Sequence, residues 1–348
     1  MKRLIVCCDG TWQKLNSEYP TNVVKIAQAI RPLCDDKITQ QIIFYGKGIG
    51  TGDRLDGIFD GAFGWSIDQN ILDAYRFLSF NYQQGDEIYL YGFSLGAYTV
   101  RSLAGLIRFS GLLERNKIRQ AIKAYTMYHD DQIQIDNKQA IRFRRKNSIS
   151  HVKIKLLGCW DTVGLLGVPN KIPLIPIDKW INKKYKRHNT YLSSIVEHAL
   201  HAVAIDEIRK FFDVIRMEKS PENPRQSLKQ MWFAGNHDCI GGGEERNSGL
   251  SDIALSWMIE ESQKLGIEFD LTKIITGIKP NPKIPFDNDP QGIFKNMGIH
   301  LRRVDENQDN LHPSVIERWS ALGDYYRPEN LAIHQAYLNS FTSSYNVA

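Results

Sequence analysis

The sequence lacks the features of disulfide-bonded, metal-binding and membrane-spanning proteins. Its 348 residues include only five cysteines, Cys7, Cys8, Cys34, Cys159 and Cys239. None of them shows the paired spacing of a metal site, and the odd count indicates reduced thiols and folding in a cytoplasm. No stretch approaches the ~20 apolar residues of a membrane span. The first apolar run, residues 4–8, ends before an aspartate and is too short for a signal peptide. We therefore expect a protein that is cytoplasmic when made and that, if exported, leaves by a signal-independent route.

A strong charge of one sign is also missing. The formal net charge is +5, and basic residues gather in two runs, residues 141–147 and 183–188. Neither run has the interleaved aromatic residues of a single-stranded nucleic-acid groove, so we expect no nucleic-acid partner. Two roles remain open for these runs, a solvated surface or a transient contact with anionic lipid or another acidic partner.

Apolar segments alternate between two kinds along the chain. Five β-branched or aromatic runs are typical of buried strands, at residues 3–10, 40–48, 86–94, 151–161 and 228–238. Helix-like patterns occupy residues 22–33, 66–82, 95–111, 190–206 and 250–266, the last with Ser251 as its cap and Asp252 in its first turn. This order predicts a mostly parallel, doubly wound sheet flanked by helices on both faces.

We expect one domain over residues 1–348. A proline-containing and then basic stretch at about 165–190 is expected to leave the domain as an excursion or lid. The residues from about 270 onward are expected to form a C-terminal surface extension rather than a second domain.

Polar residues follow the predicted strands, and in a parallel sheet these strand ends meet at one edge. Ser94 lies between Gly92 and Gly96 where a strand precedes a helix. This is the G-x-S-x-G pattern of a nucleophile elbow, in which the glycines relieve clashes in a sharp turn. The pattern predicts that Ser94 is a nucleophile. The alternative is that small residues merely begin a helix.

An oxyanion formed at Ser94 needs amide donors. The amide of Leu95 would face it from the start of the helix, and Gly10 or Thr11, after the first strand, would supply the second donor. Asp9 would support that loop or, together with Asp161, hold a divalent cation.

Two acid–base pairs fit the order serine, acid, histidine that such hydrolases follow. One is Asp161 with His237, and the other is Asp238 with His312. Ser94 therefore has Asp161 and His237 as its first candidates and Asp238 and His312 as alternates. His198 and His201 are spaced i, i+3 on a predicted helix without an adjacent third ligand, so we expect no metal site and no cofactor.

Six blocks of the sequence resemble those of an α/β-hydrolase family that includes type VI secretion lipase effectors and fungal relatives. They are LIVCCDGTW (4–12), GFSLGAYTVRSLAG (92–105), CWDTVGLLGVP (159–169), HALHAVAIDEIRKFF (198–212), WFAGNHDCIGGG with GLSDIALSWMIEE (232–261) and LHPSV (311–315). The resemblance implies an α/β-hydrolase-like, three-layer fold and a phospholipase or other lipid esterase activity. It also implies an immunity or secretion-adaptor protein as a partner.

The sequence departs from the family pattern at two places. Leu95 stands where the family has arginine, and Cys239 stands where it has a carboxylate, with Asp238 one residue earlier. The second departure favours Asp161 with His237 over Asp238 with His312.

Three functions follow from these observations. The first is a serine esterase or lipase that cleaves carboxylic esters, with lipids as the expected substrates. The second is a catalytically silent hydrolase fold that acts as a binding module. The third is a metal-dependent phosphoesterase built on Asp9, Asp161, His237 and Asp238.

Overall fold

A computed structural model describes residues 1–10, 17–48, 62–164, 190–291, 295 and 298–345. The excursion expected at about 165–190 lies, except for residue 190, outside the described residues, as do the basic run 183–188 and Thr11. Within the described part of the chain, no helix has the length and apolar composition needed to cross a membrane.

The centre of the molecule is a six-stranded sheet with all strands parallel, in the order β2-β1-β3-β6-β7-β8. Its strands are β1 (Lys2–Cys8), β2 (Gln40–Gly46), β3 (Glu87–Phe93), β6 (Ile154–Trp160), β7 (Val196–Ala204) and β8 (Ser227–Phe233). A short antiparallel pair, β4 (Leu112–Leu113) and β5 (Ser148–Ile149), lies apart from it. The predicted parallel sheet is confirmed.

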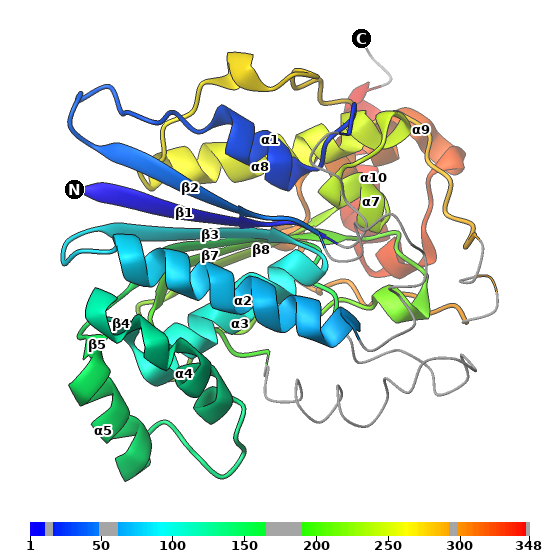
Figure 1. Cartoon of the computed structure of the whole chain (residues 1–348). Coiled ribbons are helices and arrows are strands. Elements are labelled where there is room, and N and C mark those ends of the chain that lie inside the picture. Colours follow the sequence, from blue (N-terminus) through cyan, green and yellow to red (C-terminus); the bar gives the residue numbers. More distant parts are fainter. Residues whose placement is uncertain (11–16, 49–61, 165–189, 292–294, 296–297, 346–348) are drawn as a thin grey trace.

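Helices cover both faces of this sheet (Figure 1). Their bounds are α1 (Asn22–Ala29), α2 (Ala62–Asn81), α3 (Leu95–Ser110), α4 (Ala121–Tyr128), α5 (Lys138–Asn147), α7 (His237–Gly241), α8 (Ser248–Lys264), α9 (Pro313–Leu322) and α10 (Gln335–Tyr345). α2 and α3 pack on one face, and α1 and α8 pack on the other. A first core lies between the sheet and α2 and α3, and a second core lies between the sheet and α1 and α8. Neighbouring strand residues contribute to different cores, with Cys8 in the first and Cys7 in the second. Because successive side chains of a strand point to opposite faces, the inner strands β1, β3, β6 and β7 bury most of their residues, whereas the edge strands β2 and β8 are partly exposed.

The helix predicted at residues 190–206 is wrong. This segment forms β7, which is paired on both sides with β6 and β8. The error arises because a central parallel strand is apolar on both faces, and a short apolar run rich in Ala and Leu fits either period. His198 and His201 therefore lie on opposite faces of a strand and do not share a helix face.

Two predicted element ends also need correction. β8 ends at Phe233, so His237 and Asp238 do not end the strand but begin the short helix α7, four residues further on. α8 begins at Ser248 rather than at a Ser251 cap, and Asp252 is buried within the helix, where it pairs with Lys25. The apolar pattern located both elements, but it did not resolve their first and last turns.

The segment after residue 270 packs against the sheet through a third core. One buried cluster contains Val203 of β7 and Trp232 of β8. Trp319 of α9, Leu338 of α10 and Leu331, which lies between these two helices, join it. The C-terminal segment therefore packs on the side of the sheet formed by β7 and β8. The extension is therefore held by apolar burial, the principal stabilising contribution in folding.

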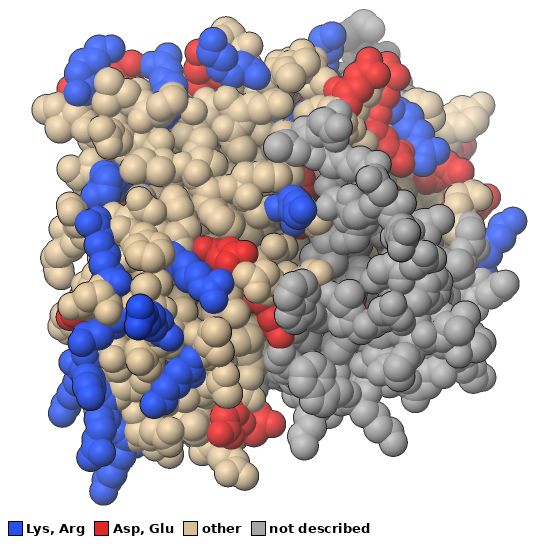
Figure 2. Space-filling view, viewed as in Figure 1, with Lys and Arg blue, Asp and Glu red and all other residues tan. Residues whose placement is uncertain are grey.

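Lysine and arginine side chains gather over α5, at the lower left of the face shown in Figure 2. The exposed basic residues of this helix are Lys138, Arg142, Arg145 and Lys146. Its buried side is formed by Ala140 and Phe143. The basic run predicted at residues 141–147 is thus largely a solvated helix face at the end of the sheet opposite the strand ends that carry Ser94.

Candidate active site

Ser94 lies on a strained turn between β3 and α3. Its backbone has φ 58° and ψ −123°, a conformation that non-glycine residues rarely adopt. A Cβ atom on Gly92 would lie 2.4 Å from the carbonyl oxygen of Gly96, and one on Gly96 would lie 2.1 Å from the carbonyl oxygen of Cys8. Only glycine fits at both positions. The Ser94 amide donates to the Trp160 carbonyl at 3.1 Å, which ties the turn to the end of β6.

The candidate oxyanion donors lie on two sides of this turn. Leu95 is buried and is the first residue of α3, so its amide lies at the positive end of the helix dipole. Gly10 follows β1, and a Cβ atom on it would lie 3.1 Å from the Cβ of Ser94. This close approach brings the backbone of Gly10 beside the candidate nucleophile.

Asp9 holds the Gly10 backbone in place. Its Oδ1 accepts the Gly10 amide at 2.8 Å, and its Oδ2 accepts the hydroxyls of Thr21 and Tyr45, each at 2.8 Å. Burial raises the pKa of Asp9 to about 6, although these hydrogen bonds lower it. Both carboxylate oxygens of Asp9 accept hydrogen bonds from protein donors, as expected of a residue that supports the loop after β1.

Asp161 and His237 are brought together at the same sheet edge. The Nδ1 of His237 lies 2.5 Å from Oδ2 of Asp161, and both side chains are buried. Asp161 follows β6 with φ 40°, and its amide donates to the Ala202 carbonyl at 2.8 Å. A histidine whose Nδ1–H is given to a carboxylate keeps its Nε2 available to accept a proton.

The ring of Phe93 connects this pair to the serine turn. Phe93 immediately precedes Ser94, and its ring centroid lies 4.6 Å from that of His237. Among the described residues there is no hydrogen bond between Ser94 Oγ and His237 Nε2. Such bonds often form only when substrate is bound.

Arg302 is a site residue that sequence reasoning missed. Its Nη1 donates to Oδ1 of Asp161 at 2.6 Å, and its Nη2 donates to Oδ2 at 3.0 Å. Burial alone would raise the pKa of Asp161, but the charge of Arg302 and the hydrogen bond from His237 hold it well below its usual range. The two residues are separated by 141 positions, and no motif of the sequence connects them.

A second charged network supports the backbone of His237. The amide of His237 donates to the buried Glu207 carboxylate at 3.2 Å, and Glu207 also accepts two bonds from the Arg209 guanidinium, at 2.8 and 2.6 Å. Arg209 Nη2 lies 3.5 Å from Oδ2 of Asp238. Glu207 lies within the family-like block at residues 198–212, but its place beside His237 follows only once residues 196–204 are recognised as strand β7.

The alternate pair, Asp238 and His312, is not brought together. Asp238 contacts Arg209, whereas His312 caps α9, with Nδ1 2.9 Å from Ser314 Oγ and its ring stacked on Phe233 at 4.4 Å. Burial lowers the pKa of His312 to about 4. In these contacts His312 has the role of a helix cap.

Cys239 occupies the position where the family pattern has a carboxylate. It is fully buried in the second core, and burial raises the pKa of its thiol to about 12. Its amide donates the capping bond to Oδ1 of Asn236 at 3.2 Å. Cys239 therefore contributes packing behind α7 rather than charge.

Metal ligation has little support at this edge. Among the described residues, no group of three or more His, Cys, Asp or Glu side chains is arranged to hold a metal ion. Both oxygens of Asp161 are already occupied by Arg302, His237 and the Ala204 amide. His201, another metal candidate, donates or accepts at both ring nitrogens with Thr162 and Gln230.

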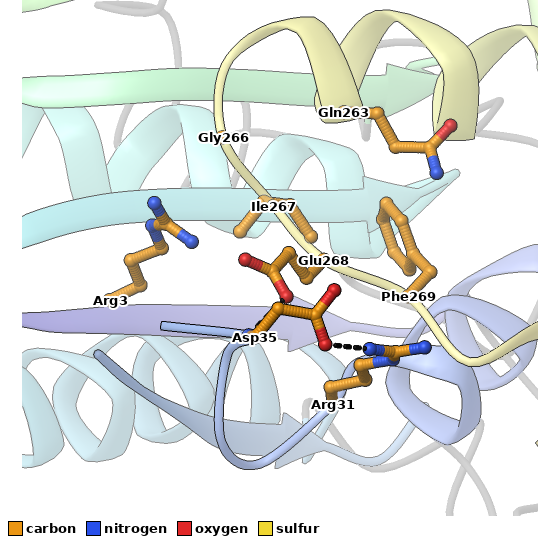
Figure 3. A pocket seen from close by; sticks show the side chains of 8 residues that line it. All are labelled: Arg3, Arg31, Asp35, Gln263, Gly266, Ile267, Glu268 and Phe269. Carbon is orange, nitrogen blue, oxygen red and sulfur yellow. Dashed lines mark hydrogen bonds and ion pairs between the residues drawn. The ribbon is translucent and has the colours of Figure 1, made fainter. Parts of the chain in front are cut away.

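A separate cavity of about 580 Å³ lies where the strands begin, far from Ser94. Figure 3 shows its charged residues, of which Arg31 and Asp35 are paired at 2.5 Å. Arg3, at the start of β1, is bonded to Glu87 at 3.2 Å. Since the cavity is at the opposite end of the sheet, it is not the substrate site of the residues described above.

The chain is also similar to known proteins. It is 30% identical over 246 residues to Uncharacterized protein YEL023C of Saccharomyces cerevisiae, covering 64% of this chain and 34% of that protein, so it spans about a third of the relative's length. A crystal structure of an uncharacterized protein from Pseudomonas aeruginosa shares 15% identity over 100% of this chain and 60% of that one, with a TM-score of 0.48. A structure of the Tle1 effector bound to the VgrG spike of the type 6 secretion system has 18% identity, a TM-score of 0.39, and coverage of 72% and 52%.

A metagenomic carboxyl esterase, MGS0156, gives 11% identity and a TM-score of 0.32, with coverage of 75% of this chain and 76% of that one. The match to a family is more specific. Residues 2–261 match the catalytic domain of the Tle1-like phospholipase effectors of type VI secretion systems, and this stretch includes Ser94, Asp161 and His237. The chain therefore belongs to the Tle1-like phospholipase effector family through that catalytic domain.

Proposed function

We propose that this chain is a serine hydrolase that cleaves carboxylic esters through an acyl-enzyme. The observation that carries the proposal is the 2.5 Å contact between His237 and Asp161 at the sheet edge where Ser94 occupies its strained turn. A hydroxyl near its ordinary pKa is a poor nucleophile, so a serine hydrolase needs such a base and orienting acid.

In the proposed reaction, Ser94 Oγ attacks the ester carbonyl while His237 Nε2 takes the hydroxyl proton. Asp161 accepts the Nδ1–H of His237 and stabilises the imidazolium. The Leu95 amide stabilises the oxyanion. Because the Gly10 amide is already bonded to Asp9, the second donor is the alternative expected from the sequence, Thr11. The ester C–O bond then breaks, His237 returns the proton to the leaving alcohol, and the acyl group remains on Ser94. Water, activated by His237, hydrolyses the acyl-enzyme and restores the serine.

The proposed substrates are lipid esters, with phospholipids first. Family membership supports this choice, since the matched domain is that of phospholipase effectors. The expected immunity or secretion-adaptor partner has the same support and stays a prediction. Transient contact with a lipid surface follows from the substrate class rather than from a described membrane-binding element.

Fluorophosphonate labelling with intact-mass readout tests the proposal, because the probe phosphonylates an activated serine. We expect one adduct on the wild-type chain and none on Ser94→Ala. His237→Ala should lose about 10³-fold or more in labelling rate. His312→Ala is the matched control, because this histidine caps α9, and it should label within a fewfold of wild type.

Two other results would support one of the alternative functions. A folded wild-type chain without labelling would support a binding module. Chelator-sensitive phosphoesterase activity that survives Ser94→Ala would support the metal-dependent alternative. If labelling occurs, release of fatty acid from phosphatidylcholine–phosphatidylglycerol vesicles, compared with a short-chain nitrophenyl ester, tests the lipid substrate.

A further inference from the structure

We propose that Arg302 is a positioning residue for the reaction, acting through Asp161. Its guanidinium fixes the Asp161 carboxylate so that one oxygen faces His237, and it keeps that carboxylate charged. The inference rests on the proposed function. It also extends the functional unit beyond the matched catalytic domain, since that domain ends at residue 261.

The hydrogen bonds of Asp161 occupy both of its oxygens. Oδ1 accepts from Arg302 Nη1 at 2.6 Å and from the Ala204 amide at 3.0 Å. Oδ2 accepts from His237 Nδ1 at 2.5 Å and from Arg302 Nη2 at 3.0 Å. A carboxylate has about four acceptor positions, so this one is fully used. Because Arg302 donates to both oxygens, rotation of the carboxyl group away from His237 would break two charge-assisted bonds.

Arg302 is itself anchored. Its Nη1 donates to the Ala204 carbonyl at 2.9 Å, and its Nη2 donates to the Phe212 carbonyl. Its carbonyl accepts from the Asn330 amide group at 3.3 Å, within the C-terminal extension. The guanidinium therefore connects the extension to the loop after β7 and to the residue that orients His237.

The pair is buried almost completely, with relative exposures of 2% for Arg302 and 0% for Asp161. Burial of a lone carboxylate favours its neutral form, so the cation is needed to keep Asp161 ionised. The other titratable groups around Asp161 and Arg302 are His237 from α7, His201 from β7, and Glu207 and Arg209 from the loop after β7. His201 stays neutral, since burial lowers its pKa to about 3. Arg209 is bound by Glu207. Within the described ranges, Arg302 is thus the arginine that contacts the carboxylate directly.

A structural role alone would give a different pattern of pH dependence. If Arg302 served only to hold the extension, its loss would lower the stability of the protein but leave the pH dependence of the Ser94 labelling rate unchanged. If Arg302 keeps Asp161 ionised, its loss allows Asp161 to bind a proton at higher pH. The acid limb of the labelling rate then moves upward.

The test measures the fluorophosphonate labelling rate of the full chain from pH 4.5 to 9. For Arg302→Met and Arg302→Gln we expect the acid limb to rise by about one pH unit or more. For Arg302→Lys, which keeps the charge but not the two-bond geometry, we expect the limb near that of wild type and a maximal rate about tenfold lower. Arg318→Met is the matched control. Arg318 is a buried arginine of the same extension, bonded to the carbonyls of Pro282 and Ile284, and its replacement should leave the limb in place.

The inference fails if a folded neutral variant keeps the wild-type limb, or if Arg318→Met shifts it equally. If neither neutral variant folds, Arg302→Lys decides, and a maximal rate within twofold of wild type would overturn the inference. Absence of labelling in the folded wild type would instead overturn the proposed function, so the two failures are distinguishable.

Discussion

At the scale of single residues, the site region contains a buried carboxylate, Asp206, to which no cation of the described residues is bonded. Asp206 accepts the Gly235 amide at 2.6 Å and the Tyr326 hydroxyl at 2.9 Å, both through Oδ2. Burial raises its pKa to about 6, although these bonds lower it. A neutral asparagine could accept the same two bonds, since its carbonyl oxygen can replace Oδ2.

We predict that Asp206→Asn becomes more stable relative to wild type as the pH rises. The folded-state pKa lies above the ordinary 3.8, so the folded protein holds this proton more tightly than the unfolded chain. That contribution is complete below pH 3.8 and is lost as the pH rises through about 6. The free energy of unfolding of the variant minus that of wild type should therefore increase by on the order of 2 kcal/mol between about pH 4 and 7.5.

Urea denaturation at both pH values measures this difference. Asp324→Asn, at an exposed position, is the matched control. A difference between Asp206→Asn and wild type that does not change with pH would contradict the prediction.

At the scale of elements, a buried ion pair joins two helices on one face of the sheet. Lys25 of α1 and Asp252 of α8 lie 2.6 Å apart, with side chains each 3% exposed. Oδ2 of Asp252 also accepts the Lys279 amide at 2.7 Å, so the carboxylate organises three segments. The helix pattern of α8 predicted its apolar positions, but Asp252 was expected to complement the helix dipole.

We predict that Lys25→Met destabilises the protein by about 3–5 kcal/mol, because it leaves a buried carboxylate without its cation. Adding Asp252→Asn should recover at least half of this loss. Urea denaturation of the wild type, both single variants and the double variant measures the coupling. Additive costs in the double variant would show that the pair acts as two independent contacts.

Much of the fold was predictable because its elements follow local patterns. Of the described elements, five of the six strands in the parallel sheet and four of the five expected helices are present, and the serine turn was identified from glycine spacing. β7 was not, because burial on both faces removes the alternation that distinguishes strands from helices. Asp161 and His237 could be named and favoured as a pair from the order of the motifs, although their contact depends on tertiary packing. Arg302 could not be named at all, because its contact depends on the packing of an extension with no motif.

At the scale of the whole molecule, the C-terminal extension completes both a core and the candidate site. Its Trp319, Leu331 and Leu338 bury Trp232 of β8, while its Arg302 reaches Asp161. The family match ends at residue 261, before all of these contacts. The residues beyond the matched stretch therefore share a buried core with β7 and β8 and contact the candidate site.

We predict that a chain ending at residue 264 does not fold cooperatively and is not labelled by a fluorophosphonate. Removal of the extension exposes the apolar face of β7 and β8 and leaves Asp161 buried without its cation. Circular dichroism melts and labelling measure the two effects, with the full chain as control. A shortened chain with a cooperative transition and wild-type labelling would show that the extension is dispensable.

The five cysteines have one more consequence. All of them are free and buried, and the thiols of Cys8, Cys159 and Cys239 have pKa values raised to about 12 by burial. Maleimides react with accessible thiolates, so the native chain should react with them only very slowly. A single cysteine placed at exposed Lys146 or Tyr325 would then carry a fluorophore or spin label without removal of any native residue. The packing of the core thus provides a ready background for following the protein on a lipid surface.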